Sequence, residues 1–292
     1  INTESLNISI EQLKRKITSK TKAIMLVHAL GNCTEMDEIV KICQKNKIIL
    51  IEDCCEALGS KYKNKYLGTF GKISTFSFYF SHHITSGEGG LILCKNRDDY
   101  EILLSLRAHG WSREIDQLNN VTNNKFDRLF NFINLGYNLR LTDIQAALLS
   151  NQVKKIDNFR KNRIFNYERI QKILKQNKFL NEKIIFVNKQ NNSKVSWFNF
   201  PILLKNFNTI KRDNLCKKLN ALGIETRPII SGNFAKQKVV KSLLKGFKQQ
   251  QFPEADIVTS SGFMIGISSF KTSKQIINRM CKDLESSIRE II

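Results

Sequence analysis

Features that would place this sequence in a membrane-spanning or metal-binding class are missing from it. No stretch approaches the roughly 18 to 20 consecutive apolar residues that a membrane-spanning helix needs. Seven cysteines are present, but none is paired at the Cys-x-x-Cys spacing of zinc and iron–sulfur sites, and their number is odd. We therefore expect reduced, mostly buried thiols in a cytoplasmic protein, with no metal site and no iron–sulfur cluster.

The sequence is also short of acidic residues. Lysine and arginine number 47 against 26 aspartates and glutamates, which gives a formal net charge of +21. Such a charge would suit a nucleic-acid-binding protein. The basic residues are scattered, however, and no basic tail or zinc-finger pattern accompanies them. We therefore expect a solvated basic surface, no nucleic-acid partner and, at most, attraction of an anionic substrate.

Apolar runs of strand length alternate with helical patterns in the first hundred residues. The predicted strands are residues 23–27, 48–51, 76–79 and 90–94, and the predicted helices are residues 8–20 and 36–45. This alternation is typical of a largely parallel sheet with both faces covered. Ligands of such sheets bind at the carboxyl ends of strands, where Asp53 and the segment after Tyr79 lie.

The second half of the sequence opens with a long helical pattern from Thr142 towards Leu174. Its first turns have an apolar face, formed by Ile144, Ala147, Leu148 and Leu149. A strand, a helix and another strand are predicted next, at residues 197–204, 212–222 and 224–228. We predict a large sheet domain at residues 1–155, followed by a long linking helix and a small α+β domain at residues 156–292.

Asp53 and Ser77 are candidate cofactor-binding residues. A carboxylate at the end of a buried strand is costly without a cationic partner. A protonated pyridine nitrogen is one such partner, because the carboxylate keeps the ring an electron sink. A helix cap or a structural ion pair explains Asp53 at least as well. Ser77 could donate to a phosphate or only satisfy a backbone group.

Two adjacent histidines, His82 and His83, follow the third predicted strand. Adjacent side chains point in different directions and chelate one ion poorly, so a metal pair is the weaker interpretation. Imidazole titrates near neutral pH, which makes general acid–base catalysis by one of them more plausible. The glycine-rich turn at residues 87–90 is weak evidence when taken alone.

Together these motifs form a specific pattern. In order they are Glu52-Asp53-x-x-x-Ala57-x-Gly59, Gly68-x-x-Gly71, Phe76-Ser77-Phe78, Gly87-Glu88-Gly89-Gly90, Arg107-x-His109-Gly110 and Gly136-Tyr137-Asn138-x-Arg140. The pattern resembles the DegT/DnrJ/EryC1/StrS family of sugar aminotransferases, and nearly the whole chain takes part. The resemblance implies an α/β fold of the fold-type I class that binds pyridoxal 5′-phosphate (PLP), and a homodimer.

His82 stands where most members of that family have the Schiff-base lysine. A subgroup has His-His-Ile-Thr there, as residues 82–85 do. It contains the nucleotide-sugar 3-dehydratases, such as those acting on GDP-4-keto-6-deoxy-D-mannose. The resemblance implies that glutamate converts PLP to pyridoxamine 5′-phosphate (PMP). His82 then acts as the acid–base group while the sugar loses its C3 hydroxyl, in deoxysugar and O-antigen biosynthesis. An aminotransferase using a displaced lysine such as Lys72, or an inactive homologue, is the alternative.

The resemblance also implies roles for the cofactor-binding positions. Asp53 would pair with the pyridine nitrogen, Glu56 would lie beside the ring hydroxyl and Ser77 would bind the phosphate. Asn138 resembles a residue that the second subunit lends to the phosphate. Family members have roughly a hundred further residues before the start of this sequence, including a phosphate-binding turn at a helix N-terminus. We therefore expect that this sequence is a fragment of a longer protein.

For the substrates, the resemblance places Ser81, His109 and Arg113 around the sugar nucleotide. Arg227 would contact the carboxylate of the amino donor, glutamate. Arginine suits both tasks because its planar guanidinium binds carboxylates and phosphates through paired hydrogen bonds.

Overall fold

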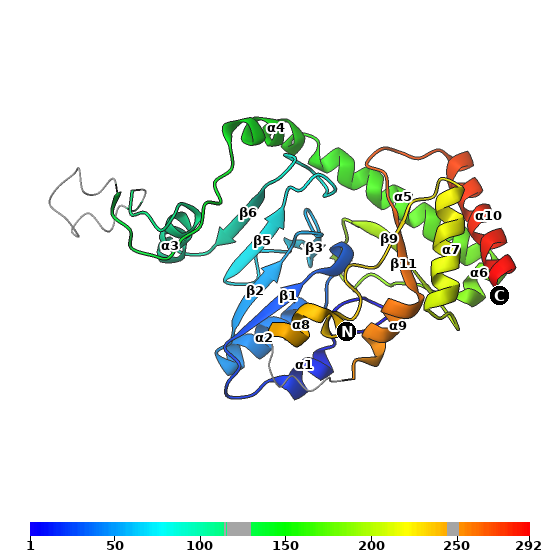
Figure 1. Ribbon diagram of the computed structural model, residues 1–292, viewed down its shortest axis with the longest axis horizontal. Helices are drawn as coiled ribbons and strands as arrows, with labels where there is room; N and C mark the ends of the chain where they lie inside the picture. The colour runs from blue at the N-terminus through cyan, green and yellow to red at the C-terminus, as the bar shows by residue number, and fades with distance from the viewer. Residues whose placement is uncertain (114, 116–129, 244–250) are drawn as a thin grey trace.

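Two four-stranded sheets and the long helix that runs beside both organise the molecule (Figure 1). The structure is a computed structural model that describes residues 1–113, 115, 130–243 and 251–292. The first sheet has the order β1-β2-β5-β6, and its strands are Ala23–Val27, Ile49–Asp53, Ile73–Ser77 and Gly90–Cys94. The second has the order β10-β11-β9-β7, and its strands are Thr226–Arg227, Gly262–Gly266, Asn199–Leu204 and Ile184–Ile185.

A short three-stranded sheet and ten α-helices complete the described part of the chain. The short sheet has the order β4-β3-β8, with strands Lys65–Tyr66, Lys61–Tyr62 and Ser193–Lys194. The helices are α1 Ile10–Lys16, α2 Met36–Asn46, α3 Arg97–Arg107, α4 Asp143–Val153, α5 Ile156–Gln176, α6 Lys178–Lys183, α7 Thr209–Ala221, α8 Lys238–Leu243, α9 Pro253–Ser261 and α10 Lys274–Ile291. None of these helices is long and apolar enough to cross a membrane.

The first sheet confirms the predicted α/β fold. Strands β1, β2 and β5 are parallel, and β6 runs antiparallel to β5. Helix α2 buries Met36 and Ile39 in the same core as Leu26 and Leu50 of the sheet. Parallel pairing brings the carboxyl ends of β1, β2 and β5 to the same edge of the sheet, where ligands of such sheets bind.

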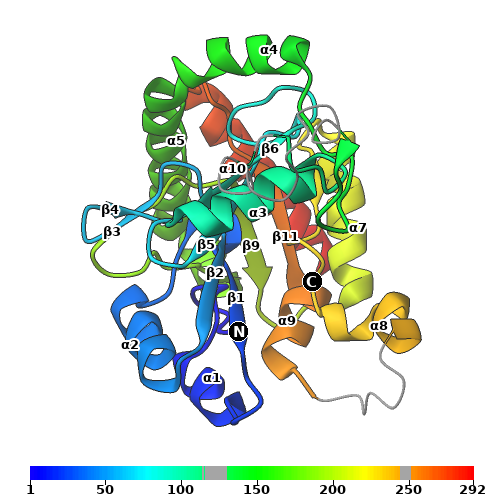
Figure 2. The same cartoon turned by 90° about the vertical axis from the view of Figure 1, so that its left-hand side faces the viewer.

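The prediction that both faces of this sheet are covered is wrong for the described residues. In β1, buried Ile24 and Leu26 alternate with exposed Met25 and Val27. Strand β6 is exposed over most of its length. Continuous apolar runs had suggested burial on both faces, but the described helices cover only one. Figure 2 shows α1 and α2 beside β1 and β2.

Two element boundaries also differ from the predictions. Strand β5 is Ile73–Ser77 rather than residues 76–79, although Phe78 beyond it still donates its backbone N–H to Gly89 O (2.9 Å). The long helical pattern is two helices, α4 and α5, separated at residues 154–155. The apolar residues Ile144 and Leu148 of α4 are 77% and 56% exposed, so they do not pack into this chain.

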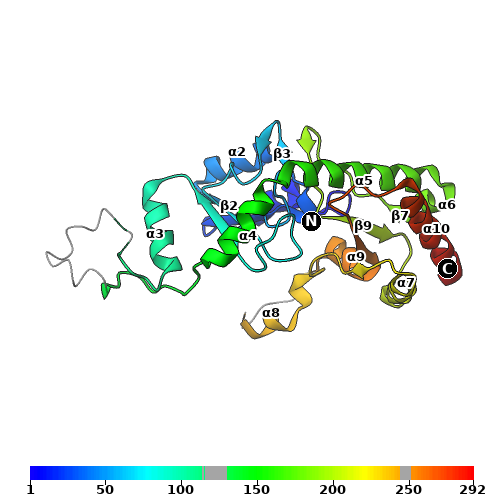
Figure 3. The same ribbon diagram turned by 90° about the horizontal axis from the view of Figure 1, so that it is seen from above.

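The second sheet lies between helices. Figures 2 and 3 show α5 and α7 on opposite sides of β9 and β11. Phe200 and Ile202 of β9 and Phe263 of β11 are fully buried in its core. Patterns at residues 197–204 and 212–222 predicted β9 and α7, whereas β11, α9 and α10 were not predicted. The division into domains at residue 155 stays a prediction.

Candidate active site

Asp53 is the last residue of β2, at the carboxyl edge of the first sheet. Its neighbours in the sheet are Val27 and Thr75, and its Oδ1 accepts the backbone N–H of Cys55 (3.0 Å). In the described part of the chain it forms no ion pair, and the residues that follow form a turn rather than a helix. The helix-cap and ion-pair explanations therefore both fail there, which leaves a half-buried carboxylate without a cationic partner among the described residues.

Glu56 lies in the turn after Asp53. Its Oε2 accepts the backbone N–H of Leu30 (2.8 Å). Burial, with a smaller contribution from the charge of Asp53, raises the pKa of Glu56 to about 7. Near neutral pH this carboxyl is therefore protonated in a large fraction of molecules and can donate a hydrogen bond.

Glu52 anchors the loop beneath this edge. Its carboxylate accepts backbone N–H groups from Gly68 (2.8 Å), Phe70 (2.7 Å) and Gly71 (2.6 Å) and lies 3.0 Å from His28 Nε2. Burial by itself would raise the pKa of Glu52, but these hydrogen bonds outweigh it and hold the pKa below its usual range. His28, Glu52 and Cys54 lie close enough to hold a metal ion, yet these four partners already occupy the carboxylate.

His82 lies five residues after the end of β5, and its backbone N–H donates to Tyr79 O (3.0 Å). Its ring centroid is 5.2 Å from that of Phe198. Its Nδ1 is buried and has no hydrogen-bond partner among the described residues. Burial lowers the pKa of His82, and the charge of Asp53 opposes part of that effect. The imidazole is therefore largely neutral at pH 7 and can accept a proton.

Ser77 closes β5 beside Asp53 and His82. Its Oγ accepts the backbone N–H of Tyr79 (3.2 Å), so the hydroxyl already has a backbone partner. The hydroxyl proton is still available for donation, because a serine can accept and donate at the same time. The backbone interpretation therefore holds, and phosphate binding by Ser77 stays a prediction.

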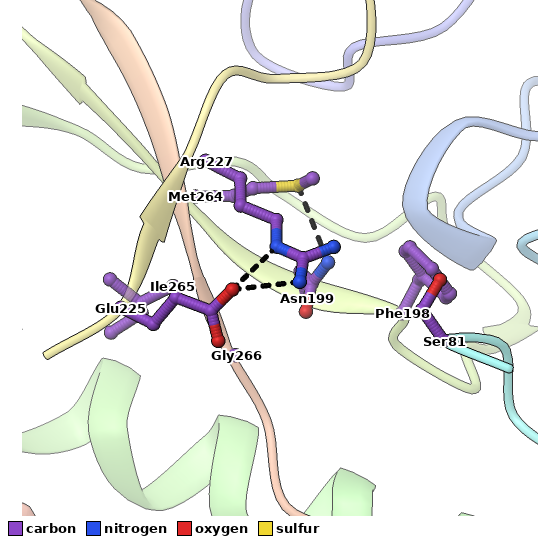
Figure 4. A pocket seen from close by; sticks show the side chains of 8 residues that line it. All are labelled: Ser81, Phe198, Asn199, Glu225, Arg227, Met264, Ile265 and Gly266. Carbon is purple, nitrogen blue, oxygen red and sulfur yellow. Dashed lines mark hydrogen bonds and ion pairs between the residues drawn. The ribbon is translucent and has the colours of Figure 1, made fainter.

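Ser81 and Arg227 line one cavity of about 150 Å³, although they are far apart in the sequence. Figure 4 shows Ser81 and Phe198 on one side and Arg227, from β10, on the other. Arg227 Nη2 lies 2.7 Å from Glu225 Oε1. The cavity therefore adjoins Phe198, which also contacts His82.

His109, Arg113 and Asn138 form a second cluster after α3. Asn138 pairs with Ala108 as an isolated β-bridge, and the ring of His109 is 4.7 Å from that of Trp111. The guanidinium of Arg113 lies 4.0 Å from the centre of the Trp111 ring. Figure 1 shows α3 on the far side of the first sheet from β9 and β11. The structure therefore does not bring these three residues into the cavity of Ser81 and Arg227.

Reasoning from the sequence missed Phe198 and Leu30. Phe198 contacts His82, and the backbone of Leu30 binds both Glu56 and Phe198. Leu30 has a φ of 53°, a left-handed conformation that is rare for a bulky residue. The signal for Phe198 was only its place in a predicted strand, and Leu30 gave no signal.

Comparison with known proteins agrees with this geometry. The profile of the DegT/DnrJ/EryC1/StrS aminotransferase family matches residues 1–284. The chain belongs to this family. GDP-4-keto-6-deoxy-D-mannose 3-dehydratase of Yersinia pseudotuberculosis is 36% identical over 282 residues, which are 95% of this chain and 70% of that protein. GDP-perosamine synthase of Escherichia coli O157:H7 is 39% identical, but over only 53% of this chain and 39% of that protein.

A solved structure shows the same relationship in three dimensions. Crystalline GDP-4-keto-6-deoxymannose-3-dehydratase with a trapped PLP–glutamate geminal diamine superposes with a TM-score of 0.87 at 34% identity. The match covers 97% of this chain and 73% of that one. The fold-type I fold and the 3-dehydratase resemblance are therefore both confirmed.

The residues present fit a pyridoxal cofactor. Asp53 is a carboxylate without an ion-pair partner among the described residues, and Glu56, with a pKa of about 7, is protonated in about half of the molecules near neutral pH. His82 Nδ1 is a buried polar atom without a partner there. A ring with a protonated nitrogen, a hydroxyl and a reactive carbon would complement these three groups.

Proposed function

We propose that this protein is a PLP/PMP-dependent nucleotide-sugar 3-dehydratase. It removes the C3 hydroxyl of a GDP-linked 4-keto-6-deoxy sugar and uses L-glutamate as the amino donor. The observation that best supports this proposal is the environment of His82. Its imidazole is neutral, half-buried and near the Asp53 carboxylate, at the position where most of the family has a lysine. The family match and the 3-dehydratase relatives support this assignment.

Each residue has a distinct task in that reaction. When bound, the cofactor supplies an amino group and an electron sink. Asp53 holds a proton on the pyridine nitrogen, Glu56 donates to the ring hydroxyl and Ser77 donates to the phosphate. A ring nitrogen of His82 would take up the proton released by the amino-bearing carbon of the bound cofactor and would deliver it to the C3 hydroxyl, which leaves as water. Because imidazole forms no stable imine, the cofactor is held without a covalent link.

Glutamate would bind in the cavity at Arg227. The exposed guanidinium can exchange Glu225 for the carboxylate of glutamate at little cost, since an exposed ion pair contributes at most about 1 kcal/mol. Ser81 stands across the same cavity and would orient the sugar or the donor.

The second cluster would serve a neighbouring subunit. His109, Arg113 and Asn138 lie together but away from the cavity of this chain. Exposed apolar side chains surround them, including Leu135 (93% exposed), Tyr137 and Leu139. A homodimer would bury this surface and bring the three side chains to the cofactor phosphate and the sugar nucleotide of the second subunit.

We also propose that the protein works in the cytoplasm. All seven cysteines are free thiols, which suits a reducing compartment.

The aminotransferase alternative has little geometric support. Lys72 precedes β5, whereas His82 follows its other end, and β5 spans about 17 Å at ~3.3 Å per residue. Lys72 Nζ is also 3.0 Å from Asp99 Oδ1. A lysine at that end of the strand does not reach the edge where Asp53 lies.

A product assay tests the proposal. The protein is incubated with PLP, glutamate and GDP-4-keto-6-deoxy-D-mannose, and the products are analysed by NMR and an ammonia assay. We expect a 3-deoxy-4-keto sugar and ammonia, with unchanged activity in Lys72→Ala. An amino sugar would instead support the aminotransferase. An absence of cofactor absorbance after reconstitution would indicate an inactive homologue.

A further inference from the structure

His83 differs from His82 in every respect that matters for chemistry. It is buried, and its Nε2 lies 3.0 Å from the carbonyl oxygen of Ser196. A carbonyl oxygen only accepts, so Nε2 must carry the proton. Nδ1 is buried and has no partner among the described residues. The geometry therefore defines one tautomer for His83, the Nε2–H form.

His83 also stays neutral where His82 titrates. Burial, followed by the positive charge of Arg163, holds the pKa of His83 at about 3, and His82 adds to this effect. The hydrogen bond to Ser196 opposes the shift but is outweighed. A histidine that never gains a proton in the working range cannot serve as the acid–base group, but it can be a fixed hydrogen-bond donor.

His83 contacts the segment of residues 196–198, and every residue of this segment forms a backbone hydrogen bond to another part of the chain. Ser196 N–H donates to Ser60 Oγ (2.8 Å), and Phe198 N–H donates to Leu30 O (3.0 Å). Arg163 Nε donates to Trp197 O (2.8 Å), and its Nη2 donates to Phe198 O. Within the described contacts, the carbonyl of Ser196 accepts a hydrogen bond from His83.

Close packing lies behind the same carbonyl. A Cβ atom on Gly31 would lie only 2.3 Å from Ser196 O, so the backbone at Gly31 presses directly on this group. Gly31 has a φ of 88°, which also favours glycine. The carbonyl is therefore held between Gly31 and His83.

Phe198, at the end of this segment, lies against both imidazoles. Its ring centroid is 5.2 Å from that of His82 and 5.6 Å from that of His83. It also lines the cavity shared by Ser81 and Arg227. The Phe198 ring therefore limits both the direction of the His82 ring and the access of water to it.

We propose that His83 is a positioning residue, a neutral hydrogen-bond donor that holds Phe198 against His82 through the carbonyl of Ser196. The positioning itself is a property of the folded chain. Only its effect on the rate rests on the proposed function. The groups that face the His82 ring are Asp53, Phe198, Tyr79 and His83. The experiment below substitutes two of them, His83 and Phe198.

Two substitutions at one position separate the donor from the side-chain volume. In His83→Leu the donor is lost and Ser196 O is left unpaired. In His83→Gln the side-chain amide can donate to the same carbonyl. Leu284→Ala, in the buried core of the second sheet, is the matched control for a general loss of stability. Phe198→Leu removes the ring but keeps the His83 bond.

The first measurement is an NMR titration of the four histidines in the cofactor-free protein. We expect His83 to stay in the neutral Nε2–H form between about pH 5 and 8. The pKa of His82 should rise by roughly half a unit in His83→Leu and in Phe198→Leu, because water regains access to its ring. It should not move in His83→Gln or Leu284→Ala. The proposal is overturned if His83 titrates in this range, or if the pKa of His82 is unchanged in both His83→Leu and Phe198→Leu.

The second measurement is turnover with glutamate and the sugar nucleotide. We expect kcat to fall roughly ten- to hundred-fold in His83→Leu with KM nearly unchanged, and to recover in His83→Gln. Equal losses in His83→Leu and Leu284→Ala would mean that His83 only stabilises the fold. If the protein does not dehydrate the sugar at all, the proposed function fails while the titration still tests the positioning of His82.

Discussion

The Asp53–His82 edge and the His109–Asn138 cluster lie in the same chain, but different forces hold them. At the edge, side chains follow the ends of paired parallel strands, and the backbone N–H groups of Leu30, Cys55 and Gly71 each donate to one of the carboxyl groups. In the second cluster, an isolated β-bridge and contacts between arginine and aromatic rings hold side chains that are largely exposed. Contacts within one chain hold the first arrangement, whereas the second is largely exposed.

The difference indicates which residues can be tested in an isolated subunit. His82 and Glu56 have shifted pKa values because residues of this chain already bury them. A group on an exposed segment acquires its environment only on assembly. Substitutions at the edge should therefore affect each subunit separately, whereas substitutions in the second cluster should affect the neighbouring subunit.

The largest effect is expected for His82→Asn. Asparagine fills a similar volume but cannot take up a proton, so ammonia release should fall roughly 10²- to 10⁴-fold. Cofactor absorbance should persist, because no covalent link depends on His82. Steady-state ammonia assays and absorbance spectra check both points. A variant that keeps more than about a tenth of the activity would contradict acid–base catalysis by His82.

Asn138→Ala tests whether the second cluster serves the neighbouring subunit. By itself it should lower cofactor affinity roughly tenfold, through the loss of one hydrogen bond to a charged group. When it is mixed with His82→Asn under subunit exchange, mixed dimers contain one intact site. Activity should then recover to about a quarter of wild type, since half of the dimers are mixed. Mixtures that show no more than the sum of the two variants would place Asn138 in its own chain's site.

Glu56 is expected to affect stability rather than turnover, through a dependence of stability on pH. Its pKa rises from 4.5 to about 7 on folding, so the folded state binds more protons between those values. The contribution is full below about pH 4.5 and is lost as pH rises through about 7. It should amount to roughly 3 kcal/mol, or several degrees in Tm. Thermal unfolding of the cofactor-free protein should show this slope, and Glu56→Gln should remove it. The exposed Glu88→Gln should keep it.

The first region was largely predictable from the sequence. The apolar run before Asp53 defined β2 and placed the carboxylate at its end, because local patterns decide where a parallel strand stops. The spacing between Glu52 and Gly68-x-x-Gly71 also has a local cause, since the Glu52 carboxylate binds three backbone N–H groups of that loop. Local rules of this kind can be read from one chain.

Contacts between distant segments could not be predicted in this way. Phe198 meets His82 only because β9 packs next to the first sheet, and no spacing in the sequence encodes that contact. The apolar face of α4 was predicted correctly as a pattern, but Ile144 and Leu148 are exposed. Periodicity indicates that a face is to be buried, without indicating which surface will bury it.

The buried guanidinium of Arg163 has a consequence for the order of folding. It is satisfied by main-chain carbonyls of Trp197, Phe198 and Ile267, which lie just before β9 and just after β11. Those carbonyls come together only when the two strands have paired, and such long-range pairing is slow compared with helix formation. We therefore expect Phe198 to take its place against the His82 ring late in folding, after α5 has formed.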